Sequence, residues 1–241
     1  RPFLQGVFLT DPKNVSARYG QSVIRGFVSG SPGLPRKGVA ELSKAIAAQV
    51  DSITYGVQVD SLEAGEAKSA AGDYKGSTII VATDATTATQ LLGLSEVARM
   101  AGCITWYHAV STNPSGTGRL VVDGQNRGPI INSIVISDIS ADYAPAGQHL
   151  ISTTTDLSAT ESDVRRHLAI MWGVSTHDWE FIAKYEIPAA LPIQAVGRPL
   201  TQPTKLSENL FVVGDHRAVP SQQGALFSGQ MAAKLILNEG R

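Results

Sequence analysis

Residues 210–237, LFVVGDHRAVPSQQGALFSGQMAAKLIL, constrain the fold of this chain more than any other segment. The apolar run up to Gly214 predicts a strand over 208–215, and the small and apolar residues after the loop predict a helix over 224–237. Gly214 lets another group approach the backbone closely, and Asp215 offers a carboxylate that accepts hydrogen bonds. The segment therefore predicts a strand, a tight turn, a loop and a helix in direct succession.

Two interpretations of this βα unit follow from its residues alone. The helix start at Gly224 would present unpaired amide groups and the positive end of the helix dipole to an electron-rich ligand. Alternatively, the helix is part of an ordinary βα unit and packs closely through its small side chains, which are Ala225, Ser228, Gly229, Ala232 and Ala233. The residues alone leave both interpretations open.

The rest of the chain mixes helical and extended patterns. Spacing and composition predict helices over 12–30, 39–50, 84–92 and 158–173. The expected N-cap of the helix over 84–92 is Asp84 or Thr83. The helix over 158–173 is expected to begin with Ser158 or Thr160 as its N-cap and to end at Gly173. Alternating or β-branched runs predict strands over 53–64 and 77–83, several strands of an antiparallel sheet over 102–155, and a further strand that begins near 179.

Composition excludes several classes of function. The 241 residues carry 20 Lys and Arg against 21 Asp and Glu, so no broad basic field exists for nucleic acid. No apolar run approaches the ~20 residues of a membrane helix, and no secretory leader is visible. A lone cysteine, Cys103, excludes an intrachain disulfide and a multi-cysteine metal site. We expect a cytoplasmic protein without a nucleic-acid partner, a transmembrane span or a metal site.

Common catalytic and phosphate-binding motifs are missing from the sequence. It contains no GxSxG elbow and no GxxxxGK loop, and its five histidines form no ligand pair at helical spacing. Gly116-Thr117-Gly118 begins like a GxGxxG loop, but Val121 stands where the third glycine belongs. We interpret that segment as a hairpin turn.

Three segments resemble a known family. The pattern GD-x5-SQQGAL-x-SG-x2-AA-x2-IL resembles the C-terminal flavin motif of the FAD-dependent group that contains amine oxidases, protoporphyrinogen oxidases and phytoene desaturases. LPRKGVAELSKAIAAQV, then ITYGVQVDSLE and STIIVATDATTATQLL, is similar to the family's P-x-GG helix and the strands after it, although Arg36-Lys37 replaces the usual glycine. The opening RPFLQGVFLTDP resembles the start of the substrate domain in desaturase-like members.

The resemblance implies an α/β fold, or α+β for the fragment alone. Residues 31–94 and 206–241 would form parts of an incomplete Rossmann-like FAD-binding domain. Residues 1–30 and 95–205 would form a substrate-binding domain built on an antiparallel sheet.

The resemblance also implies which residues would hold FAD. The backbone of Val59 would meet the adenine, and Thr83 and Asp84 would lie near the diphosphate or ribityl region. Gly214 and Asp215 would hold the ribityl–phosphate part. The helix start, made of Gln223, Gly224 and Ala225, would face the pyrimidine side of the isoalloxazine and stabilise negative charge on the reduced ring.

A departure from the family is the lack of its opening GxGxxG βαβ unit, which takes ~30 residues. We therefore expect the chain to be the C-terminal part of a longer flavoprotein, inactive alone and partnered by the missing N-terminal FAD-binding segment. Strands near 53–59 and 209–213 would lie beside that neighbour, and their exposed edges would also permit a homodimer.

The favoured function is an FAD-dependent oxidoreductase that oxidises a C–N or C–C bond of a small molecule by hydride transfer to flavin. Candidate substrate residues are Trp106, Tyr107, Trp172 and Tyr185, for which core packing is the alternative role. No catalytic acid or base is expected, because the flavin carries the redox chemistry. The alternatives are a non-catalytic binding or assembly module that keeps the fold without its nucleotide loop, and a nicotinamide-dependent Rossmann enzyme.

Overall fold

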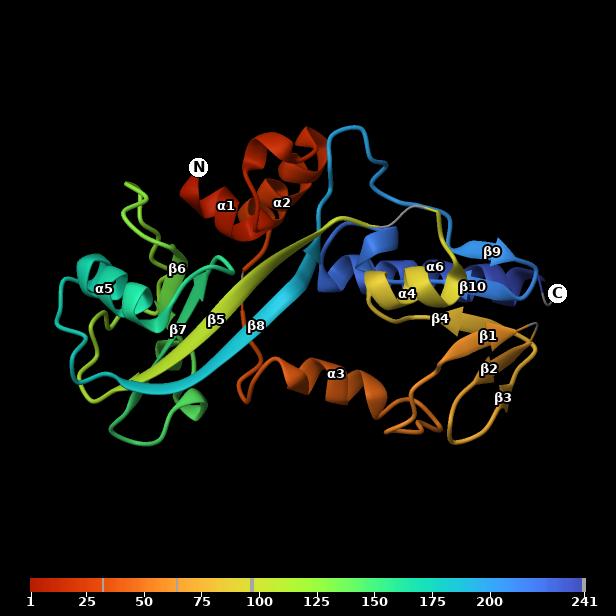
Figure 1. Ribbon diagram of the computed structural model, residues 1–241, viewed down its shortest axis with the longest axis horizontal. Helices are drawn as coiled ribbons and strands as arrows, with labels where there is room; N and C mark the ends of the chain where they lie inside the picture. Colours follow the sequence, from red (N-terminus) through yellow and green to blue (C-terminus); the bar gives the residue numbers. More distant parts are fainter. Residues whose placement is uncertain (32, 64, 96–97, 240–241) are drawn as a thin grey trace. The chain divides into compact units, whose positions relative to one another are not determined.

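A computed structural model describes the chain except for residues 32, 64, 96–97 and 240–241 (Figure 1). The described residues divide into two compact units. The first unit comprises residues 1–13, 25–51 and 101–190, and the second comprises residues 14–24, 52–100 and 191–241. Each unit has its own sheet and its own buried core.

The first unit is built on a four-stranded sheet in the order β6-β7-β5-β8. Its strand β7 runs antiparallel to both β5 and β6, as the sequence predicts. Within the region 102–155, where several strands are expected, residues 118–124 form no regular strand, and Val121 makes only an isolated bridge to Ser133. The strands are β5 (Met100–Val110), β6 (Ile130–Val135), β7 (His149–Thr155) and β8 (Glu180–Pro192).

Helix α5 (Glu161–Trp172) packs against this sheet through Val164 and Leu168, which are fully buried. Both of its predicted ends are confirmed. The side chain of Thr160 caps the Asp163 amide, and Gly173 ends the helix at φ 69°, a left-handed conformation that favours glycine. Ile104, Trp106, Ile151 and Trp179 complete the core on the sheet side.

The remaining helices of the first part of the chain are α1 (Pro2–Phe8), α2 (Ala17–Ser29) and α3 (Ala40–Ala47). The apolar face that predicted α3 is exposed rather than buried, since Val39, Leu42, Ile46 and Val50 are each at least 40% exposed. The helix is present as predicted, but no described element covers that face fully.

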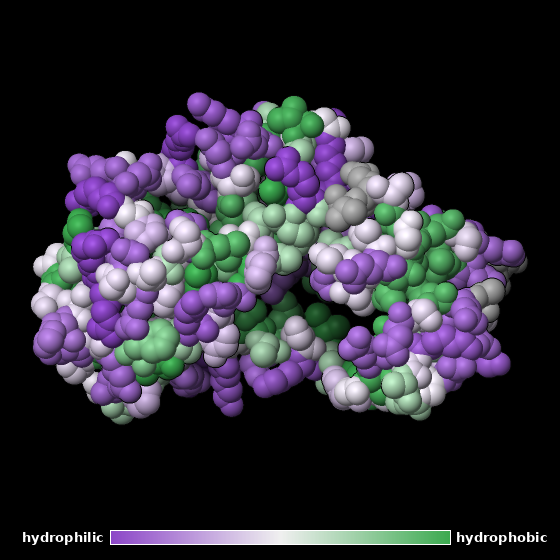
Figure 2. All heavy atoms as spheres, viewed as in Figure 1, coloured by the Kyte–Doolittle hydropathy of each residue, from purple (hydrophilic) through white to green (hydrophobic). Residues whose placement is uncertain are grey.

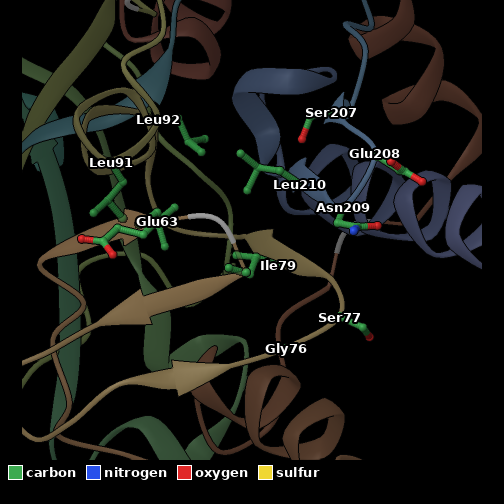
Figure 3. A pocket seen from close by; sticks show the side chains of 12 residues that line it. Glu63, Gly76, Ser77, Ile79, Leu91, Leu92, Ser207, Glu208, Asn209 and Leu210 are labelled. Atoms are coloured by element: carbon green, nitrogen blue, oxygen red, sulfur yellow. The ribbon is translucent and has the colours of Figure 1, made fainter.

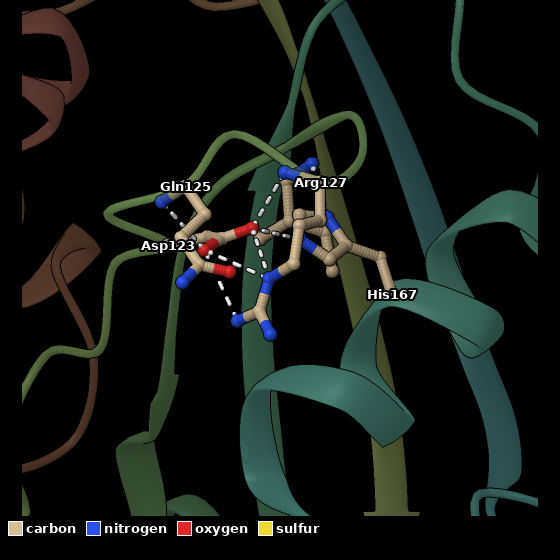
Figure 4. A network of polar contacts seen from close by, with 5 residues as sticks. Asp123, Gln125, Arg127 and His167 are labelled. Atoms are coloured by element: carbon tan, nitrogen blue, oxygen red, sulfur yellow. Dashed lines mark hydrogen bonds and ion pairs between the residues drawn. The ribbon is translucent and has the colours of Figure 1, made fainter.

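A buried carboxylate ties the loop before β6 to α5 (Figure 4). Asp123 accepts hydrogen bonds from the Gln125 amide and from both the backbone and the guanidinium of Arg127. The Nδ1 atom of His167 accepts the Ile130 amide, so Nε2 carries the proton and donates to Asp123 over 2.9 Å. The Arg127 side chain contributes most to a pKa of Asp123 far below its ordinary value.

We predict that Asp123→Ala lowers the free energy of unfolding by about 3 kcal/mol, because it leaves the buried Nε2–H of His167 without its acceptor and removes the acceptor of the Gln125 and Arg127 amides. Asp142→Ala is the matched control in the same unit. Its 2.8 Å ion pair with Arg36 is exposed, so the loss should stay below about 1 kcal/mol. Urea-induced unfolding measures both, and equal losses would contradict the role assigned to Asp123.

The second unit contains a three-stranded sheet in the order β4-β10-β9. Strand β4 (Ile79–Val81) runs parallel to β10 (Leu210–Val212), and β9 (Lys205–Ser207) runs antiparallel to β10. Side chains alternate along β10: Phe211 packs toward α6 (Gln222–Glu239), and Val212 packs toward α4 (Ala85–Leu92). The predicted βα unit is thus confirmed, with helices on both faces of a sheet.

A separate antiparallel meander of three short strands belongs to the same unit: β1 (Ser61–Glu63), β2 (Glu66–Lys68) and β3 (Tyr74–Lys75). The expected strand over 53–64 is wrong for its first part, because regular pairing begins only at Ser61. Within this meander, Lys68 forms ion pairs with Glu66 and Asp73.

The expectation that residues 209–213 form an open edge is also wrong. Strand β10 is paired on both sides, because β9, for which the sequence pattern predicts no strand, pairs with its second edge. The outer strands of this sheet are instead β4 and β9, each of which is paired only with β10 among the described strands. Among the described helices, none is both long and apolar enough to cross a membrane.

Candidate functional site

The parallel pairing of β4 with β10 brings two predicted cofactor segments to one edge of the sheet. Val81 and Val212 are register partners, and the Val213 amide donates to the Val81 carbonyl over 2.9 Å. Thr83-Asp84 and Gly214-Asp215 follow these strand ends, each after one intervening residue. In open α/β sheets, ligands bind outside the carboxyl ends of the strands. This edge is therefore the candidate site.

On the β4 side, Asp84 is the N-cap of α4. Its carboxylate accepts the amides of Thr86 and Thr87 and the Thr87 hydroxyl. The Thr87 hydroxyl contributes most to a lowered pKa of Asp84. The capping role predicted for Asp84 is confirmed, so a ligand here would meet a carboxylate already fixed by the helix.

On the β10 side, a sharp turn places Asp215 next to the strand end. Gly214 has φ 149°, and a Cβ at this position would lie 2.6 Å from the His216 ring, so only glycine fits. Burial raises the pKa of Asp215, and the His216 amide, which donates to the carboxylate, offsets this effect in part, with a smaller contribution from Arg198. The ring nitrogens of His216 are buried without a hydrogen-bond partner, and burial lowers the pKa of His216 to about 4. The imidazole of His216 is therefore uncharged at neutral pH, and it packs against the turn at Gly214.

Helix α6 begins two residues earlier than predicted, and its start is not bare. The Ser221 hydroxyl accepts the Gly224 amide over 3.0 Å, which is an ordinary N-cap bond. The amides of Gln222 and Gln223 lie ahead of it in the first turn, where helix geometry provides no intrahelical acceptor. These two amides, rather than that of Gly224, are the donors available to a ligand.

Packing within the chain itself requires glycine at position 224, with or without a ligand. A Cβ there would lie 1.9 Å from the Val219 carbonyl oxygen, so the loop backbone contacts the helix start directly.

The other predicted cofactor residues differ in exposure. Ala225 is half-buried and Gln223 is exposed. Val59 is half-buried just ahead of Asp60, whose amide pairs with the Lys68 carbonyl of the meander.

We predict that Gly224→Ala destabilises the protein and that Gly224→Val does so more strongly, because either side chain displaces Val219. Gly229→Ala is the matched control on the same helix. A Cβ there meets nothing within 4 Å, so the change should be neutral or stabilise by up to about 1 kcal/mol. Thermal unfolding of the three variants checks this. An unchanged unfolding temperature in Gly224→Ala would show that the loop backbone does not contact the helix start this closely.

A large hollow in the second unit lies at the other end of the same strands (Figure 3). It has a volume of about 700 Å³, and Ile79 and Leu210, the first residues of β4 and β10, help to line it. Hydrophobic side chains gather over this part of α4 and β10 in Figure 2. Since it opens at the amino ends of the strands, it is not the edge that the motif residues form.

In the first unit, the four candidate substrate residues lie in two different environments. Tyr107 and Tyr185 meet edge to face at 6.0 Å and line an open hollow of about 480 Å³. Trp106 is buried and donates to the Thr155 hydroxyl, and Trp172 packs on the core and donates to the Ser133 hydroxyl. Of the four candidate substrate residues, only Tyr107 and Tyr185 line this hollow.

Comparison with known proteins gives the same assignment as the motif. The family model of flavin-containing amine oxidoreductases matches residues 1–237. This chain belongs to that family. The α/β fold with an added antiparallel sheet is thereby confirmed, and the family description implies a flavin cofactor. No curated protein matches the sequence significantly.

Several solved structures share the fold. A reduced UDP-galactopyranose mutase matches with a TM-score of 0.75 at 15% identity, over 99% of this chain and 63% of its own. A protein from Exiguobacterium sp. 255-15 assigned as a protoporphyrinogen oxidase gives 0.65 at 13%, over 84% and 51%. An oxidoreductase from Methanosarcina mazei gives 0.58 at 16%, over 82% and 54%. The chain thus spans between half and two thirds of their lengths.

The edge formed by β4 and β10 fits a flavin nucleotide in its donor and acceptor chemistry. Asp215 supplies a half-buried acceptor for sugar-alcohol hydroxyls, and the α6 start supplies amide donors for electron-rich atoms. Sequence reasoning missed the residues that hold this edge in place, namely Tyr19, Arg198 and Ser221. Of these, Ser221 could have been found as a cap three residues before Gly224.

Proposed function

We propose that the full-length protein containing this chain is an FAD-dependent oxidoreductase acting on a small molecule. With FAD bound, the protein would oxidise a C–N or C–C bond: the substrate would lose a hydride from carbon to the flavin and a proton from the neighbouring atom. The bound flavin supplies this two-electron chemistry, and the protein orients the reactants. The observation that carries the proposal is the flavin-type turn and helix start at the shared carboxyl edge of β4 and β10, within a chain of this family.

Each predicted cofactor residue has a role in this proposal. Gly214 and Asp215 hold the ribityl–phosphate part, with the Asp215 carboxylate as acceptor for a ribityl hydroxyl. Gln223, Gly224 and Ala225 lie beside the pyrimidine edge, where the positive end of the α6 dipole favours negative charge on the reduced ring. The proposal also places Thr83-Asp84 near the diphosphate or ribityl region and the backbone of Val59 at the adenine.

The substrate is proposed to meet the first unit. Tyr107 and Tyr185 line its open, mostly apolar hollow, which suits a small molecule with an apolar or aromatic part. Trp106 and Trp172 support the sheet from its core side. Residues 31–94 and 206–241 remain the proposed cofactor segments, and 1–30 and 95–205 the proposed substrate segments.

The open edge of β4 is the proposed position of a further strand, from a dinucleotide-binding βαβ unit elsewhere in the protein. On this account the chain alone is inactive, because that unit carries the diphosphate loop. The same edge would permit a homodimer, and we propose a cytoplasmic location.

The test is the full-length protein purified and examined for flavin absorbance. We expect bound FAD in the wild type, and about ten- to hundredfold weaker FAD binding in Asp215→Ala, because a hydrogen bond to a charged group is lost. Asp142→Ala, which removes an exposed carboxylate of the first unit, should bind FAD like the wild type.

A full-length protein that neither carries nor binds FAD would refute the proposal and favour the non-catalytic module. Normal FAD binding in Asp215→Ala would instead show that the cofactor residues are misassigned.

A further inference from the structure

The loop between β10 and α6 is held at both ends by residues remote from it in sequence. At its beginning, the Arg198 guanidinium donates to the His216 carbonyl over 2.9 Å. At its end, the Tyr19 hydroxyl donates to the Pro220 carbonyl over 2.9 Å, across 201 residues of sequence. The next residue, Ser221, caps α6. Tyr19 therefore acts directly on the backbone that sets where the helix starts.

Tyr19 is itself fixed within the second unit. It lies on α2 and is 4% exposed. Just ahead of it, Val15 bridges to Ala195, and the Ser16 amide donates to the Gln194 carbonyl. The buried Gln194 side chain in turn donates to the carbonyls of Arg198 and Pro199. Segments 14–24 and 191–199 are thus hydrogen-bonded to each other. Together they bind the loop at the His216 carbonyl, through Arg198, and at the Pro220 carbonyl, through Tyr19.

The hydroxyl of Tyr19 is a constant donor. Burial, followed by the negative charge of Asp215, raises the pKa of Tyr19 to about 12, so the group stays protonated at neutral pH. Tyr19 thus holds the end of the loop whose beginning is Asp215, the residue proposed to bind the ribityl chain.

We propose that Tyr19 is a positioning residue for the flavin site, which sets the α6 start and the Asp215 carboxylate through its hydrogen bond to Pro220. The inference rests on the proposed function and adds to it a residue outside the flavin motif. A preformed loop binds more tightly because less conformational freedom is lost on binding. Without the hydroxyl, the loop end and the buried Pro220 carbonyl lose their anchor.

The test uses Tyr19→Phe in the full-length protein, because phenylalanine keeps the ring and removes only the hydroxyl. Tyr143→Phe is the matched control: its hydroxyl donates to the Pro35 carbonyl over 2.7 Å, a bond of the same kind within the first unit. FAD dissociation constants are measured by fluorescence titration of the apoproteins, the bound flavin's reduction potential by dye equilibration, and stability by urea-induced unfolding.

We expect the dissociation constant for FAD to rise about three- to tenfold in Tyr19→Phe, the equivalent of one neutral hydrogen bond, with a shifted reduction potential. Tyr143→Phe, which loses a part-buried hydrogen bond, should lose no more stability than Tyr19→Phe and keep both flavin properties. Arg198→Gln, which frees the other end of the loop, should weaken FAD binding as well and covers the case of a poorly folding Tyr19 variant.

A Tyr19→Phe protein that is less stable but binds FAD with wild-type affinity and potential would overturn the inference, since Tyr19 would then be structural only. Loss of FAD binding in the wild type itself would refute the proposed function, so the two failures are distinguishable.

Discussion

The arrangement of the candidate site depends on the parallel pairing of two short strands, β4 and β10. Their register joins Leu210 to Ile79, Phe211 to Ile80 and Val212 to Val81, although about 130 residues of sequence separate them. This pairing places the cap of α4 and the turn before α6 at the same edge. If the register slipped by one residue, Phe211 and Val212 would exchange faces, and the packing on both helices would be lost.

Beyond that edge, two glycines allow close contacts that a Cβ would block. Gly214 makes room for the His216 ring, and Gly224 makes room for the Val219 carbonyl. The loop between them is therefore compact, and Ser221 and Ser228 bond backbone amides at its end and at the strand end. Glycines that a family motif would assign to the cofactor alone are also required by the chain's own folding.

Local signals predicted a large part of this fold. The cap at Thr160, the stop at Gly173 and the strand–helix succession around Gly214 are encoded within a few residues, so the sequence alone reveals them. The short strand β9 and the true open edge at β4 depend on pairing between distant segments, and short-range patterns carry no such information. The same holds for Tyr19, because nothing near it in sequence indicates that its hydroxyl reaches Pro220.

Hydrogen–deuterium exchange of the full-length protein, with and without FAD, tests most directly which end of the β4–β10 pair faces the cofactor. Our account predicts that FAD slows exchange in peptides covering 82–87 and 213–225, and leaves peptides covering 62–65 and 205–210 unchanged. Slower exchange confined to the second pair of peptides, around the hollow at the amino ends of the strands, would contradict it.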